Sequence, residues 1–247
     1  MAYFEHELRY RRFKNLLDDV CEKIARAFNL FDSRGHPRKA LILTELLRHS
    51  CLGCIAKNLI KSSKERDIDA IYLENHKFAL NLLTERLLNF PNIHSKVHLR
   101  SEVLGEYGRV DLLIESEDIQ IIVEVKTGKG FSYAQIFRYL IERPHATIVV
   151  WRVMMHQTFS IRGIECFNLT LACMDMAIRR GLALLNASQI PLCNHRPLKR
   201  KGSNTEKPQE IVDRFIQAVI DDLPNVIRVI LCEIEALKQL QAIRRAR

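Results

Sequence analysis

Apolar residues recur every three or four positions along most of the chain, and this spacing predicts a protein built largely of helices. Leu17, Val20 and Ile24 follow it within residues 3–30. The same pattern predicts further helices at residues 38–62, 68–89, 132–143, 167–187 and 208–244. Each is long enough to bury one apolar face against a common core.

Glycine, proline and polar runs divide this pattern. Gly53 leaves open whether residues 38–62 form one helix or two helices that meet there. Pro224 predicts a break in the last helix, because proline lacks the N–H that the helix ladder needs. Residues 194–209 are almost devoid of apolar side chains and are predicted to form an exposed loop or linker.

The pattern changes to the alternation typical of strands in the middle of the chain. The expected strands cover residues 95–104, 109–115, 119–126, 146–153 and 158–164, the last being the least regular. A three-strand meander followed by a helix and an apolar strand predicts an α/β fold. We expect a mixed β-sheet of about four to five strands, flanked by helices and extended by helical N- and C-terminal additions.

This order of elements suggests four parts of the chain. They are a helical N-terminal region at 1–66, a core at 67–190, a basic linker or loop at 191–209, and a C-terminal helical region at 210–247.

Composition places the chain among globular proteins, with 47% hydrophobic and 27% charged residues. No apolar run approaches the roughly 20 residues that span a bilayer, and the first residues lack the apolar stretch of a secretory signal. We therefore expect an intracellular, cytoplasmic protein without a membrane partner. The seven cysteines are odd in number and predict reduced thiols rather than a disulfide framework.

The net charge of +9 is unevenly distributed. Residues 1–66 carry +6, residues 67–160 carry −2 and residues 161–247 carry +5. Basic flanks attract a polyanion such as nucleic acid, while an acidic centre suits a cation. Basic proteins without nucleic-acid function are common, so the charge by itself decides little.

Three charged residues interrupt the apolar hairpin formed by the second and third strands. If its turn is centred between Glu117 and Asp118, Asp111 lies directly across from Glu124, with Cβ atoms about 4.5–5.5 Å apart. Strand alternation then places Glu124 and Lys126 on one face. Buried charges are costly unless they are paired or bound to metal. A bridging divalent cation is the first interpretation, and an ion pair between Lys126 and one acid is the second.

These residues carry a resemblance to a known family. The segment GRVD, which ends at Asp111, precedes VEVKTG, which contains Glu124 and Lys126. Together they resemble the motif of the PD-(D/E)xK, or restriction-endonuclease-like, nuclease superfamily. Gln135 and Tyr139 on the following helix resemble the Gln-x-x-x-Tyr element of its RecB-type branch.

The resemblance covers residues 70–153, with Val110 in place of the proline that gives the superfamily its name. Many members lack that proline. The resemblance implies a nuclease that uses Mg²⁺ or Mn²⁺ and acts on DNA. Asp111 and Glu124 would be metal ligands, and the backbone carbonyl of Val125 would be a further ligand.

The remaining roles also follow from the resemblance. Lys126 would orient or deprotonate the attacking water and stabilise charge that develops on the phosphate. Gln135 and Tyr139 lie one helical turn apart and would steady Lys126 or touch the nucleic acid. The residues expected to contact phosphates are Arg109, Lys129, Lys199, Arg200 and Lys201.

The identity of the upstream acidic ligand stays open. Glu74, near the start of the helix at 68–89, is the first candidate, and Glu85 on the same helix is the second. His76 is a further candidate, because the branch often has a histidine in this region. Glu102 and Glu106 are weaker choices.

Cysteines offer a second kind of metal site. Some RecB-type nucleases hold a four-cysteine iron–sulfur cluster, with one cysteine before the core and three after it. Cys51, Cys54, Cys166, Cys173 and Cys193 could supply such a set, but their downstream spacings are looser than that arrangement requires. We therefore expect Mg²⁺ or Mn²⁺ rather than an iron–sulfur cluster.

Two functions remain in view. The first is a metal-dependent nuclease, and the second is a nucleic-acid-binding or scaffolding protein that keeps the fold without turnover. The apolar stripe at 227–237 would suit either a homodimer interface or packing on the core. The sequence does not distinguish exonuclease from endonuclease or define the structure of the DNA.

Overall fold

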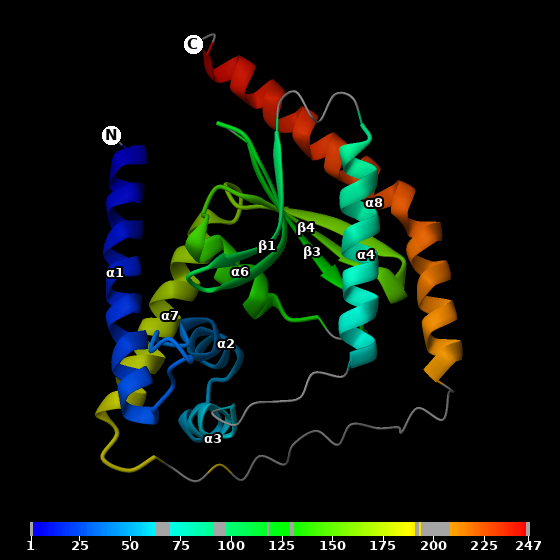
Figure 1. The fold of residues 1–247 in the computed structure, drawn as a ribbon. Coiled ribbons are helices and arrows are strands. Elements are labelled where there is room, and N and C mark those ends of the chain that lie inside the picture. The colour runs from blue at the N-terminus through cyan, green and yellow to red at the C-terminus, as the bar shows by residue number, and fades with distance from the viewer. Residues whose placement is uncertain are drawn as a thin grey trace.

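The computed structural model contains a five-stranded mixed sheet between layers of helices (Figure 1). It describes residues 2–62, 70–90, 97–117, 119–128, 131–190, 193 and 208–245. The strands are β1 (His98–Gly105), β2 (Gly108–Glu115), β3 (Gln120–Lys126), β4 (Thr147–Arg152) and β5 (Gln157–Arg162). They lie in the order β1-β2-β3-β4-β5, and all neighbours are antiparallel except β3 and β4. The predicted fold class is confirmed.

The helices follow the predicted apolar segments closely. They are α1 (Ala2–Phe28), α2 (Lys39–Arg48), α3 (Leu52–Ser62), α4 (Ala70–Leu88), α6 (Tyr133–Glu142), α7 (Phe167–Asn186) and α8 (Pro208–Arg245), with a 3-10 turn at Val153–Met155. The segment 38–62 is two helices, and the break falls before Gly53 rather than at it. None of the helices in the described part of the chain is both long enough and apolar enough to cross a membrane.

The break expected at Pro224 is wrong, because α8 continues through this residue. The helix changes direction along its length, as Figure 1 shows. A proline inside a helix removes one backbone hydrogen bond and commonly bends the helix. Packing on both sides of Pro224 keeps the two halves of α8 helical, since Leu223, Val226 and Ile227 are all buried.

One face of the sheet is covered by α4 and α8. Their buried side chains share a hydrophobic cluster with Val123 and Val125 of β3 and with Trp151 of β4. Ile230 and Ile234 of the stripe at 227–237 belong to this cluster. Of the two interpretations of that stripe, the structure supports packing on the core.

The opposite face of the sheet is covered by α6, whose Ile136, Tyr139 and Leu140 pack against Ile122 and Ile148. Beyond α6 lies a layer made of α1, α2, α3 and α7 (Figure 1). The predicted division placed α7 with the core at 67–190, but α7 runs along α1 and shares the hydrophobic cluster of the N-terminal helices.

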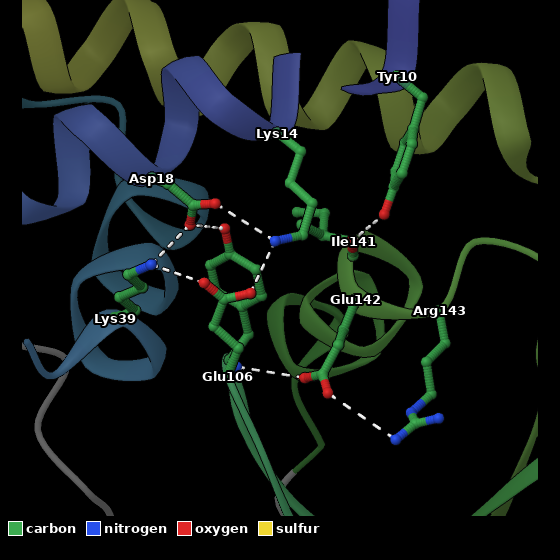
Figure 2. A network of polar contacts seen from close by, with 9 residues as sticks. Tyr10, Lys14, Asp18, Lys39, Glu106, Ile141, Glu142 and Arg143 are labelled. Atoms are coloured by element: carbon green, nitrogen blue, oxygen red, sulfur yellow. Dashed lines mark hydrogen bonds and ion pairs between the residues drawn. The ribbon is translucent and has the colours of Figure 1, made fainter. Parts of the chain in front are cut away.

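A polar network joins this helical layer to the turn between β1 and β2 (Figure 2). Asp18 of α1 accepts hydrogen bonds from Lys39 at 2.8 Å and from the Tyr107 hydroxyl at 2.6 Å. Lys14 and Lys39 also pair with Glu106, at 2.7 and 2.6 Å. The network therefore holds the turn of the β1–β2 hairpin against α1 and α2.

The β1–β2 turn has two residues, Glu106 and Tyr107, between the paired Gly105 and Gly108. Gly108 has φ +144°, and a Cβ there would lie 2.9 Å from Nη1 of Arg138. Only glycine fits this position without strain. The turn places β2 so that Asp111 follows three residues after Gly108.

Candidate metal centre

The register of the β2–β3 hairpin agrees with the sequence-based expectation. Leu112 pairs with Val123, and Ile114 pairs with Ile121. Continuing this register by one residue places Asp111 opposite Glu124. The backbone N–H of Val125 donates to Asp111 Oδ2 at 2.8 Å, which ties the carboxylate of β2 to β3.

Glu124 is the most enclosed acid of the group, with 2% of its side chain exposed. Lys126 and Gln135 both donate to its Oε1, the latter from Nε2 at 2.5 Å. The Tyr139 hydroxyl lies 2.6 Å from Glu124 Oε2 and 2.8 Å from the backbone carbonyl of Arg109, so both oxygens are within hydrogen-bond distance of its single proton. Lys126 and Gln135 therefore hold one carboxylate oxygen of Glu124, and Tyr139 holds the other.

Gln135 connects the remaining polar groups. Its Oε1 accepts a hydrogen bond from Lys126 Nζ at 2.6 Å, and its Nε2 also donates to the Tyr139 hydroxyl at 2.8 Å. Gln135 and Tyr139 lie on one face of α6, because residues four apart in a helix are neighbours. The structure thus brings together Glu124, Lys126, Gln135 and Tyr139, the predicted residues of the hairpin and of the Gln-x-x-x-Tyr element.

Helix α4 supplies a histidine to the same centre. His76 Nε2 lies 3.3 Å from Asp111 Oδ1, and only 18% of the His76 side chain is exposed. With Val125 N–H on Oδ2, both oxygens of Asp111 have a partner. The centre therefore takes one residue from α4, one from β2, two from β3 and two from α6.

The pKa values in the centre are shifted because two acids, Asp111 and Glu124, lie close together in a buried place. Burial raises the pKa of Glu124, and the neighbouring negative charge of Asp111 adds to this effect. The hydrogen bond to Asp111 raises the pKa of His76, against the opposing effect of burial. Burial also raises the pKa of Tyr139, and the Glu124 carboxylate raises it further. A cation would lower the cost of holding both carboxylates ionised.

Neither sequence candidate for the upstream acid is joined to the centre in the described part of the chain. Glu74 and Glu85 both have exposed side chains on α4. Among the described residues, no hydrogen bond or ion pair joins either of them to Asp111, Glu124 or Lys126. His76 takes the place next to Asp111, because it lies two residues, about 200° of helical rotation, from Glu74 and faces the sheet.

The other described residues predicted from the sequence do not contact the carboxylates of Asp111 and Glu124 through their side chains, or they form ion pairs elsewhere. Arg109 is half exposed and pairs with Glu102 at 3.2 Å. Glu106 belongs to the polar network of α1 and α2. The Val125 side chain is buried on the opposite face of the sheet. Four predicted phosphate contacts lie outside the described residues, namely Lys129, Lys199, Arg200 and Lys201.

One supporting residue was not expected from the sequence. Arg138 lies between Gln135 and Tyr139 in the chain, and its Nη1 donates to the backbone carbonyl of Tyr107 at 2.8 Å. Burial lowers the pKa of this guanidinium, although nearby Tyr139 and Glu124 act against that effect. The signal available in the sequence was an arginine within an otherwise apolar stretch of α6. Arg138 links the helix of the candidate site to the β1–β2 turn.

Comparisons with models of protein families, with curated protein sequences and with solved structures give no match. The functional argument therefore rests on the residues of this chain and their geometry.

Proposed function

We propose that the protein is a metal-dependent nuclease that hydrolyses phosphodiester bonds in DNA. The observation that carries the proposal is the juxtaposition of Asp111 and Glu124 on adjacent strands, with Lys126 on the face of Glu124. The resemblance of these residues to the PD-(D/E)xK motif supports the same conclusion. It is further supported by Gln135 and Tyr139, which contact Glu124 directly.

The donor set suits a hard divalent cation. Mg²⁺ prefers oxygen ligands and retains several waters, so two carboxylates and a backbone carbonyl are sufficient. Asp111, Glu124 and the carbonyl of Val125 would hold the ion, and His76 stands beside Asp111. When bound, the cation would neutralise a phosphate oxygen and lower the pKa of a water. Both oxygens of Asp111 and Oε2 of Glu124 have one polar partner each and keep acceptor capacity for a cation. Oε1 of Glu124 already accepts from both Lys126 and Gln135.

The protein's own groups would supply position and charge. Lys126 would orient or deprotonate the attacking water and stabilise negative charge as it develops on the phosphate. Gln135 holds Lys126 through its carbonyl and Glu124 through its amide, so it fixes the distance between them. Tyr139 fixes the other oxygen of Glu124. Such support matters because catalytic groups misplaced by about 1 Å can lose two orders of magnitude in rate.

The basic flanks favour nucleic acid as the substrate. The N-terminal and C-terminal thirds carry the whole excess of positive charge, while the region that contains both acids is slightly negative. Lys and Arg contacts to phosphates supply most of the non-specific affinity for DNA. The charge distribution therefore supports a DNA backbone held by the basic flanks, on either side of the region that contains Asp111 and Glu124.

The test is cleavage of linear, circular, single-stranded and branched DNA, with and without Mg²⁺ or Mn²⁺. Asp111→Asn and Glu124→Gln should each abolish cleavage and leave the fold intact. Asp111→Asn removes one of two neighbouring negative charges and can still accept the hydrogen bond from Val125 N–H, so this metal-free variant should melt no earlier than the wild type. Glu124→Gln replaces an accepting oxygen by an amide group that only donates, so it should melt somewhat earlier. Glu115→Gln is the matched control, because Glu115 lies at the end of β2 and pairs with Arg100. Its cleavage rate should equal that of the wild type.

If both carboxylate variants cleave at the wild-type rate, the assigned centre is wrong. The alternative function is nucleic-acid binding without turnover. A wild-type protein that binds DNA and cleaves none of these substrates with either metal would support that alternative.

A further inference from the structure

Three cysteines from two distant parts of the chain converge beside the start of α3. Cys51 precedes α3, Cys54 lies in the first turn of α3, and Cys193 follows α7. Their sulfur atoms all lie within 4.8 Å of one another. Cys54 Sγ and Cys193 Sγ are 2.8 Å apart although 139 residues separate them.

We propose that Cys51, Cys54 and Cys193 bind one zinc ion, in a site separate from the carboxylate centre. Thiolate is the preferred protein ligand of structural zinc, and a spacing of C-x₂-C is typical of such sites. Three thiolates leave one position of the tetrahedron for a water molecule or another donor. The site would join the start of α3 to the chain that follows α7.

The start of α3 brings Cys51 and Cys54 to one side of the helix. The Ile55 N–H donates to the Cys51 carbonyl at 3.1 Å, so Cys51 stands at the N-cap of α3. Cys54 follows three residues later and lies on the same side of the helix. The partial positive charge of a helix N-terminus acts in favour of thiolates placed there. Without metal, the hydrogen bond with Cys193 raises the pKa of Cys54, so the thiols would lose their protons as zinc binds. Bringing Cys193 to the same point then supplies the third ligand.

The spacing of the sulfurs favours a single ion over a cluster. Around one zinc, with Zn–S bonds of about 2.3 Å, tetrahedral geometry sets the sulfurs about 3.8 Å apart. The three sulfurs lie within 4.8 Å of one another, and Cys54 Sγ and Cys193 Sγ, now 2.8 Å apart, would separate slightly to admit the ion. In an iron–sulfur cluster the thiolates bind different irons and therefore stand farther apart. Cys166, which packs against the cluster on the α6 face, and Cys173, which is buried in α7, lie outside the group. A disulfide between Cys54 and Cys193 would leave the approach of Cys51 unexplained.

The ion would contribute to stability by closing a long loop of the chain. Linking Cys54 to Cys193 restricts the unfolded chain over that whole separation, and closing long loops gives the larger entropic effect. The site would also fix the point from which the basic segment with Lys199, Arg200 and Lys201 continues. Its role is structural and does not depend on the nuclease proposal.

The test measures metal content and does not use activity. Full-length protein purified under reducing conditions should contain one zinc per chain by elemental mass spectrometry. Replacement by Co²⁺ should give the intense near-ultraviolet absorption of cobalt–thiolate bonds. Cys54→Ser and Cys193→Ser should each bind at least about a hundredfold more weakly, since even outer-shell changes cost 10- to 100-fold. Cys232→Ser, at an exposed cysteine outside the group, should keep the wild-type content.

Chelation tests the same site without any substitution. A strong chelator should lower the melting temperature of the wild type and of Cys232→Ser, and should leave that of Cys54→Ser unchanged. The proposal is overturned by a wild-type protein that takes up neither zinc nor cobalt, or by a Cys54→Ser variant that binds them normally. It is equally overturned by labile sulfide with iron, or by a Cys54–Cys193 disulfide in the protein as isolated.

Discussion

At the scale of single residues, Lys126 decides between the two proposed functions. Its ammonium contacts Glu124 Oε1 and Gln135 Oε1, and 20% of its side chain is exposed. A group that acts in the transition state affects rate more than affinity. In the nuclease, Lys126→Ala should bind DNA within a few-fold of the wild type. With Mg²⁺ present, its melting temperature should change little, while cleavage should fall by at least about two orders of magnitude.

Three measurements on this one variant separate the alternatives, namely melting temperature, DNA affinity and cleavage rate. Lys23→Ala is the control, because Lys23 forms an exposed pair with Asp19 on α1. In a scaffold, Lys126 would be a structural ion-pair partner, and its removal would leave two acids uncompensated. Early melting of Lys126→Ala, with no metal-dependent cleavage by the wild type, would end the enzyme hypothesis.

At the scale of elements, the close approach of α1 and α7 depends on Gly181. A Cβ at this position would lie 2.2 Å from Val20 Cγ1. Alanine normally stabilises a helix relative to glycine by about 0.5–1 kcal/mol. Here overpacking should reverse that sign, and Gly181→Ala should destabilise the protein by about 1–3 kcal/mol in denaturant unfolding. Adding Val20→Ala, which removes the contacted methyl group, should recover part of the loss; simple additivity of the two changes would contradict this account.

The docking of α1 and α2 on the β1–β2 turn should respond to acid through Asp18. Burial acts to raise the pKa of Asp18, but hydrogen bonds from Lys39 and Tyr107 and the charge of Lys14 outweigh it, so the pKa is lowered from 3.8. The folded state therefore stabilises the ionised form of the Asp18 side chain. The stability that Asp18 contributes is fully present above pH 3.8 and is lost as the pH falls through the lowered pKa.

Comparison with Asp18→Asn measures this contribution. At pH 7 the variant should be less stable by about 1.5–3 kcal/mol, the scale of hydrogen bonds to charged groups. That difference should shrink as the pH falls below 3.8. Asp19→Asn, at an exposed neighbouring acid, should show a much smaller effect at every pH. A deficit for Asp18→Asn that stays constant into acid would show that the carboxylate charge is not what holds the turn.

At the scale of the whole molecule, local patterns predicted the elements but not the contacts between them. Period and register determine a hairpin, so Asp111 and Glu124 could be placed opposite one another from sequence alone. The contact of Asp18 with Tyr107 spans 89 positions, and that of Cys54 with Cys193 spans 139. No local signal encodes such pairs, and only the family resemblance had placed Cys54 and Cys193 in one candidate set of ligands. The helical position of His76 beside Asp111 depended likewise on how α4 packs on the sheet.

The charge distribution leads to a prediction for the complete protein. If the basic flanks contact phosphates, the logarithm of DNA affinity should fall linearly with the logarithm of salt concentration. Each neutralised phosphate contributes about 0.9 to that slope.

Replacing Lys199, Arg200 and Lys201 by Glu should weaken binding and reduce the slope by up to about 2.7, which corresponds to three phosphate contacts. Affinity for Mg²⁺ should not change, because Asp111 and Glu124 remain. Binding measured by fluorescence anisotropy between low and moderate salt gives both slopes. An affinity that stays flat over this range would exclude the basic flanks as the binding surface.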